Sequence, residues 1–191
     1  MTTEEHQSRT ARSYKLLLLF AMVSMTMMFA GLTSAFIVSK PRADWLKDFQ
    51  LPTAFYFSTT VIILCSVTFH LAKKAIQKDN QSATTTFLLA TLSLGILFVI
   101  LQFLGFSQIV ANGYYFTGTE SSITTTFLYL VTVVHLAHLA GGLISLSIII
   151  FNQLKHKYNS TQAIGIELGA MYWHFLDGLW VFLFLFLYFF K

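Results

Sequence analysis

Five ionisable residues lie within otherwise apolar stretches near the C-terminus of this 191-residue chain: His135, His138, Glu167, His174 and Asp177. His135 and His138 are three residues apart, so a helix places them on one face. Glu167 and His174 are seven apart and nearly in line, with Asp177 one turn further on. Because ionisable groups in hydrocarbon are costly and normally find partners on other helices, we expect a structural polar network that joins two helices. Within it, His174 would pair with Asp177, and a histidine of the earlier helix would reach Glu167 or a backbone carbonyl.

The same residue types could support other chemistry. Two histidines on different helices could be the axial ligands of a haem, and His135, His138 and Asp177 could compose a non-haem metal triad. Intramembrane acids and imidazoles also line proton and ion pathways. A stand-alone membrane haem or metal redox protein, or a small proton or ion transporter, is therefore the alternative to a structural network. We expect no catalytic residue and no metal bound by this chain. The single Cys65 excludes an internal disulfide and any site built from several cysteines.

The elements that carry these residues are predicted to be transmembrane helices. The chain is 55% hydrophobic and only 10% charged, which excludes a soluble monomer. About 20 apolar residues cross a bilayer as a helix, and lipid-embedded backbone must satisfy its own hydrogen bonds. We therefore predict an all-α integral membrane bundle of five helices, a single domain over 16–191 preceded by a polar N-terminus at 1–15. The expected spans are about 16–39, 53–72, 85–109, 124–152 and 164–190.

The basic residues predict the orientation of this bundle, because cationic loops are retained in the cytoplasm. One side holds eight of them: Arg9, Arg12, Lys15, Lys73, Lys74, Lys78, Lys155 and Lys157. The other side holds four: Lys40, Arg42, Lys47 and Lys191. The N-terminus, 1–15, is thus expected in the cytoplasm and the C-terminus on the outer side. Since the cations are spread over loops beside apolar spans, nucleic acid is not expected as a partner.

Small and amide side chains indicate which helices pack together. Gly141 and Gly142 in the fourth span, and Gly169 with Ala170 in the fifth, allow a neighbouring backbone to approach closely. We therefore expect the fourth and fifth helices to pack against each other. Gln102, alone in the third span, is expected to form a hydrogen bond to another helix.

Two motifs on the last two helices resemble subunit III of the haem-copper respiratory oxidases, the cytochrome c and quinol oxidase family. The segment GIELGAMYWHFLDGLW, 165–180, is similar to the family's last helix, which has a Glu seven residues before the His of a Tyr-Trp-His-Phe-x-Asp-x-x-Trp run. The preceding helix of the family carries His-x-x-His-x-x-x-Gly. The residues that match are His135, His138, Gly142, Glu167, Tyr172, Trp173, His174, Phe175, Asp177 and Trp180. The first three spans match only loosely, with Met25 and Gly105 where the family has glutamates.

The resemblance implies a five-helix bacterial form of a subunit that itself carries no catalytic centre. Such a subunit would dock on the catalytic subunit I and associate with the other oxidase subunits. The haem and copper are expected in these partner subunits. It would bind phospholipid between its helices, where Gly142, Tyr172, Trp173, Phe175 and Trp180 are possible lipid contacts. Its expected work is to stabilise subunit I and to support proton uptake during O₂ reduction in aerobic respiration. The expected location is the bacterial inner membrane, with a respiratory supercomplex as a possible larger assembly.

Overall fold

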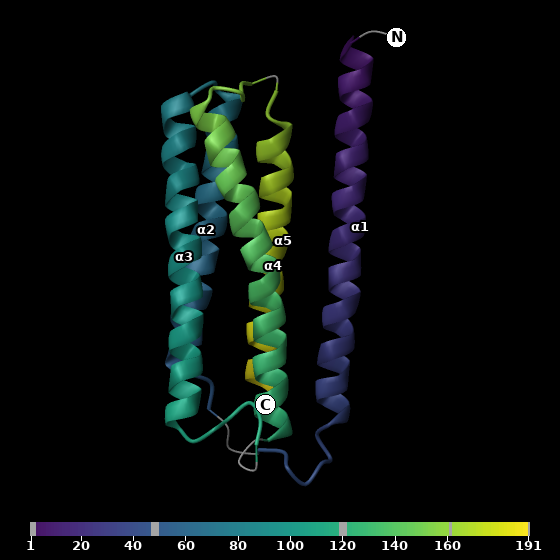
Figure 1. Ribbon diagram of the computed structural model, residues 1–191, viewed down its shortest axis with the longest axis vertical. Coiled ribbons are helices and arrows are strands. Elements are labelled where there is room, and N and C mark those ends of the chain that lie inside the picture. The colour runs from purple at the N-terminus through teal and green to yellow at the C-terminus, as the bar shows by residue number, and fades with distance from the viewer. Residues whose placement is uncertain (1–2, 47–49, 119–121, 161, 191) are drawn as a thin grey trace.

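The computed structural model describes residues 3–46, 50–118, 122–160 and 162–190, and the side chains from residue 9 onward. The described chain is helical, with five long helices joined by short connections (Figure 1). All five are long and apolar enough to cross a membrane, which confirms the predicted all-α bundle. The helices are α1 (Thr3–Val38), α2 (Thr53–Gln77), α3 (Gln81–Ala111), α4 (Ile123–Leu154) and α5 (Ile164–Phe190).

Most helices are longer than the apolar stretches that predicted them. Helices α1, α2 and α3 extend beyond their apolar cores into polar sequence, so the polar N-terminal segment is helical from Thr3. The α2–α3 turn is set by Asp79, whose positive φ of 53° ends the first helix. Asn80 then caps the next helix by accepting a hydrogen bond from the Ala83 N–H. Polar residues thus determine where these helices end, while the length of each apolar stretch determines whether the helix is long enough to cross a membrane.

Helices α2 to α5 form a bundle, and α1 lies at its side (Figure 1). Within the described residues α1 contacts only α5 and α4, whereas α2 packs closely on α3 and also contacts α5. The core between these helices is rich in aromatic rings, including Phe55, Phe98, Trp173 and Trp180. The residues of greatest interest are therefore carried by α4 and α5, which lie between α1 and the α2–α3 pair.

The eight basic residues of the more cationic side gather at one end of the bundle, which we call the basic end. It comprises the start of α1, the end of α2 with the following turn, and the connection from α4 to α5 (Figure 1). Of the four cations predicted for the opposite side, Lys40 and Arg42 follow α1 at the other end, while Lys47 and Lys191 lie outside the described residues. The orientation of these ends in a membrane stays a prediction.

Candidate functional site

The motif on α5 is joined to α2 by three side-chain contacts at successive levels. Ser66 Oγ lies 2.6 Å from His174 Nδ1. The indole N–H groups of Trp173 and Trp180 donate to Cys65 Sγ at 3.2 Å and to Thr59 Oγ1 at 3.1 Å. Because the two tryptophans are seven residues apart, they lie on one face of the helix. Partners on α2 thus satisfy the indole N–H groups of both tryptophans and the Nδ1 atom of His174.

Two of the other predicted site residues, Glu167 and His138, find partners in two different places. Glu167 Oε2 accepts a hydrogen bond from Lys15 Nζ at 2.7 Å, which forms an ion pair between α5 and α1. His138 Nδ1 contacts the Val134 carbonyl of its own helix at 2.8 Å. The expected contact between a histidine of α4 and Glu167 is therefore not formed, although a histidine does reach a backbone carbonyl.

Asp177 and His135 are buried without a hydrogen-bond partner among the described residues. Asp177 is 4% exposed and His135 is fully buried, and neither carboxyl oxygen nor either ring nitrogen makes a hydrogen bond. The expected pair of His174 with Asp177 is absent, and the Nδ1 atom of that histidine contacts Ser66 Oγ instead. The imidazole of His135 lies instead among aromatic rings, with its centroid 5.2 Å from that of Trp180. The five ionisable residues are thus near one interface but do not form one continuous network.

Glycines bring α4 and α5 together as predicted. A Cβ atom added to Gly142 would lie 3.1 Å from Leu176 Cδ1 and 3.3 Å from Trp173 Cζ3, which is closer than ordinary carbon contacts. Gly169 on α5 likewise faces the side chain of Ile149 on α4. The Tyr172 hydroxyl donates a hydrogen bond to the His138 carbonyl at 3.0 Å. The predicted packing of these two helices is therefore confirmed.

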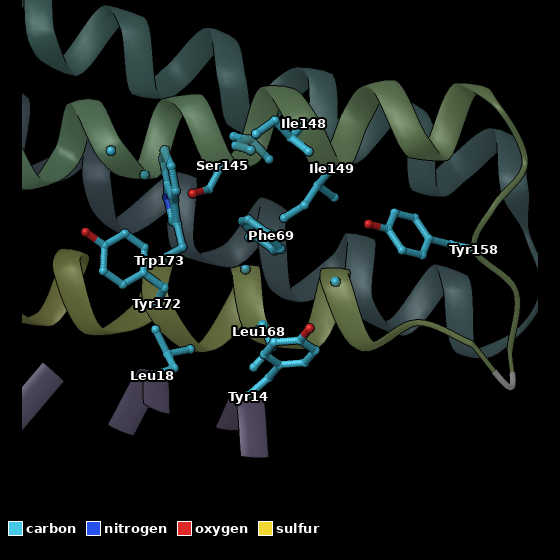
Figure 2. A pocket seen from close by; sticks show the side chains of 15 residues that line it. Tyr14, Leu18, Phe69, Ser145, Ile148, Ile149, Tyr158, Leu168, Tyr172 and Trp173 are labelled. Carbon is cyan, nitrogen blue, oxygen red and sulfur yellow. The ribbon is translucent and has the colours of Figure 1, made fainter. Parts of the chain in front are cut away.

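A groove of about 510 Å³ opens beside this interface (Figure 2). Its wall combines the glycines of α4 and α5 with apolar and aromatic side chains, and Tyr14 and Leu18 of α1 face it from the other side. Three of the family-motif residues, Gly142, Tyr172 and Trp173, line this groove, whereas Phe175 faces a second groove between α1 and α5 together with His174. Trp180 is fully buried and lines neither groove.

The arrangement favours helix packing and apolar ligands over metal chemistry. Among the residues that the structure describes, no three His, Cys, Asp or Glu side chains are grouped so that they could hold a metal ion. The triad considered for His135, His138 and Asp177 is accordingly not assembled. What the site offers is a set of hydrogen bonds between helices and an apolar groove of a size that suits acyl chains.

Sequence reasoning missed the partners of the motif residues. Lys15, Thr59 and Ser66 provide an ion pair and two hydrogen bonds to α5. Hydroxyl residues are frequent in transmembrane helices, and many here bond only to their own backbone, as Thr26 does to the Met22 carbonyl. Thr59 and Ser66 are seven residues apart on α2, but they contact Trp180 and His174, which are six apart on α5, so matching spacings do not indicate these partners.

Comparison with known proteins agrees with the resemblance seen in the two motifs. Residues 2–191 match the protein family described as cytochrome c oxidase subunit III. The chain is 32% identical over 142 residues to cytochrome c oxidase subunit 3 of Spodoptera frugiperda, covering 74% of this chain and 90% of that protein. It is also 32% identical over 142 residues to the same subunit of Drosophila yakuba, covering 74% of this chain and 51% of that one.

A bacterial relative shows a similar level of sequence identity. The probable cytochrome c oxidase subunit 3 of Rickettsia conorii is 32% identical over 155 residues, covering 78% of this chain and 50% of the relative. The chain thus spans about half the length of the Drosophila and Rickettsia proteins. Since the family match extends over nearly every residue, and since the motifs of α4 and α5 lie at a packed helix interface, the chain belongs to the cytochrome c oxidase subunit III family.

Proposed function

We propose that this chain is the subunit III of a bacterial haem-copper terminal oxidase, and that it stabilises the catalytic subunit rather than performing the redox reaction. It would lie in the inner membrane with its basic end in the cytoplasm and would support proton uptake while a partner reduces O₂ to water. The haem and copper would belong to subunit I and the other oxidase subunits. The donor of electrons to that partner would be cytochrome c or a quinol.

The observation that carries this proposal is that the motif residues of α5 form hydrogen bonds to neighbouring helices. Tyr172, Trp173, His174 and Trp180 make hydrogen bonds to α4 or α2, and the described residues hold no group arranged for a metal. The polar atoms of this family motif therefore serve helix packing. Hydrogen bonds within the subunit keep its helices in fixed positions, so its surface has a constant shape. Such a surface is suited to stabilising the catalytic subunit against which it packs.

Phospholipid is the ligand that we propose for the groove beside Gly142. The groove is lined mainly by apolar and aromatic side chains, and its tyrosines carry hydroxyl groups at both margins (Figure 2). The Lys15–Glu167 ion pair lies near the basic end, and Lys15 is the residue after Tyr14 on α1. Acyl chains would fill the apolar part, while the headgroup would lie near these polar residues.

The test of this proposal is a gentle purification from native membranes. A tag on the chain should retain a larger polypeptide that carries haem, with an oxidase spectrum and oxygen consumption. If the purified chain alone held haem or iron, the stand-alone redox protein would replace our proposal. If the chain were isolated without partners and carried protons or ions across vesicle membranes, a role as a transporter would replace our proposal.

A second test separates bracing from catalysis. Replacing His174 with Ala removes its contact with Ser66, so the subunit should be lost from the complex more readily and the active lifetime of the oxidase should shorten. The initial turnover of freshly prepared, haem-loaded complex should stay near the wild-type value. An immediate loss of all turnover in an intact complex would contradict a bracing role.

A further inference from the structure

The Asp177 carboxyl group is the one buried acid in the described part of the chain. Its residue is 4% exposed, both of its oxygens lack a hydrogen bond, and neither ion pair in the described residues involves it. A carboxylate held in such a place, with no cation paired to it, is strongly unfavourable. The site is therefore suited to a carboxyl group that holds a proton.

A row of exchangeable groups leads from this carboxyl toward the basic end. The Ser66 side chain lies beside Asp177 and is at present in contact with His174 Nδ1 at 2.6 Å. The ring of His174 lies 6.2 Å, centroid to centroid, from that of His70 on α2. His70 is exposed and lies seven residues before the end of α2 at Gln77, so that about 10 Å of helix separates it from that end.

We propose that Asp177 is a buried proton-binding site that exchanges protons with water at the basic end through His70, His174 and Ser66. A proton from water binds His70 and passes to His174, directly after a small ring rotation or through one water. The His174 ring gives up a proton from Nδ1 to Ser66 Oγ as it gains one on Nε2. The hydroxyl rotates and gives a proton to a carboxylate oxygen of Asp177. Every proton that enters at the imidazole is thus matched by one delivered to the carboxylate. Ser66 is again a neutral hydroxyl, whereas His174 is left as its Nε2–H tautomer and regains the Nδ1–H form, by turning its ring or by exchange through water, before the next transfer.

The surroundings leave few other routes. The charged or titratable groups within electrostatic range of this row are Cys65, which interacts with Asp177, and Lys73, which interacts with His174, both on α2. The Cys65 sulfur accepts the Trp173 indole N–H and contacts the Thr91 carbonyl. From α1, the groove wall next to His174 brings hydroxyl and apolar residues, such as Thr33, whose hydroxyl donates to carbonyls of its own helix. The hydroxyl of Ser66 is therefore the carrier that best links the acid to the imidazoles.

This inference does not depend on the chain's being an oxidase subunit, because its readout is the chain's own carboxyl group. The full chain, with the partners that it retains, is placed in lipid nanodiscs and followed by infrared spectroscopy. The difference between wild type and Asp177→Asn should contain the C=O stretch of a protonated carboxyl group at neutral pH. Transfer into D₂O should then shift this band at the rate at which the proton exchanges.

The relay predicts how variants change that rate. Ser66→Ala removes a positioned carrier and should slow the exchange by about 100-fold, the lower part of the range for positioned proton donors and acceptors. His70→Asn should slow it as well. Ser147→Ala, which removes an exposed hydroxyl bonded only to its own helix on α4, and His156→Asn, at the basic end, are the matched controls and should exchange at the wild-type rate.

Either of two results would overturn the inference. The first is the absence of a carboxyl C=O band that depends on Asp177. The second is exchange in the Ser66→Ala and His70→Asn variants as fast as in the controls. If Asp177→Asn does not accumulate in the membrane, Ser66→Ala still decides the question. This variant should shift the frequency of a carboxyl C=O band, because the hydroxyl beside that carboxyl group is lost. It should also slow the exchange of that band in D₂O. If either change is missing, the relay is refuted.

Discussion

Gly142 permits a sharp test of how closely α4 and α5 are packed. A methyl group added there would lie 3.1 Å from Leu176 Cδ1, 3.3 Å from Trp173 Cζ3 and 3.4 Å from Tyr172 Cε1. Carbon atoms attract best at about 3.5–4.0 Å, so all three contacts are too short. Two of the neighbours are aromatic rings, and both of these are tied by hydrogen bonds to other helices. They cannot yield without losing those bonds.

Gly141 is the matched control, because it is the adjacent residue of the same helix. A methyl group there would meet only the Tyr172 hydroxyl oxygen, at 3.9 Å. Both substitutions to Ala gain about 1 kcal/mol of helix propensity. The overpacking at Gly142 should cost about 1–2 kcal/mol, the lower part of the usual range, since a single methyl is added. Gly142→Ala should therefore be less stable than Gly141→Ala by about that amount.

The measurement is the free energy of unfolding of each full-length variant in lipid bicelles, followed by tryptophan fluorescence as SDS is added. Shortening the nearest neighbour provides a second check. In the background of Leu176→Val the penalty of Gly142→Ala should fall by at least about 0.5 kcal/mol, as expected for residues in contact. Equal stability of the two alanine variants, or a penalty that does not depend on Leu176, would refute the close packing described here.

Three further predictions concern other contacts of this interface. Tyr172→Phe removes the hydroxyl that donates to the His138 carbonyl and should cost about 0.5–1.5 kcal/mol in the same SDS titration; no change would mean that this bond does not hold α4 to α5. Glu167→Gln breaks the ion pair with Lys15, whose side chains are 36% and 43% exposed, so the cost should be at most about 1 kcal/mol. Spin labels on α1 and α5 should then show a broader distance distribution, and an unchanged one would contradict the tether. Ser145→Phe fills part of the groove, so phosphorus analysis should find less phospholipid retained, while equal retention would remove this groove as the lipid site.

The sequence predicted the helices and their packing well, because these depend on local composition. Charge-free stretches marked four of the spans and an apolar stretch marked the fifth, and Gly142 and Gly169 correctly indicated that α4 packs on α5. Gln102 was expected to bond to another helix, and its Nε2 donates to Ser58 Oγ of α2 at 2.9 Å. The helix ends were predicted less well, since polar residues such as Lys73 continue a helix past the apolar core.

The partners of the buried polar groups could not be predicted from the sequence. Helical spacing places His174 and Asp177 on one face, but whether they bond to each other depends on what the neighbouring helix presents there. In this fold that neighbour is α2, and its Ser66 contacts the histidine first. Likewise, Glu167 lies close to Lys15 only because α1 packs along α5. These pairings join residues more than 100 positions apart, and no local pattern encodes them.

The concentration of the family motif on α5 follows from the place of this helix in the bundle. Within the described residues, α5 packs against α1, α2 and α4, and the ring of its Trp180 also lies 5.2 Å, centroid to centroid, from that of Phe98 on α3. Glu167 bonds to α1, Tyr172 to α4, and His174 with both tryptophans to α2. Each neighbour is thus held by its own residues on a different face. Because lipid offers no hydrophobic drive for helices to associate, such bonds and close glycine contacts must hold the helices together. A motif that bonds to three neighbours from one helix fixes the positions of four helices with few polar groups, and each group that forms such a bond avoids the cost of remaining unpaired in hydrocarbon.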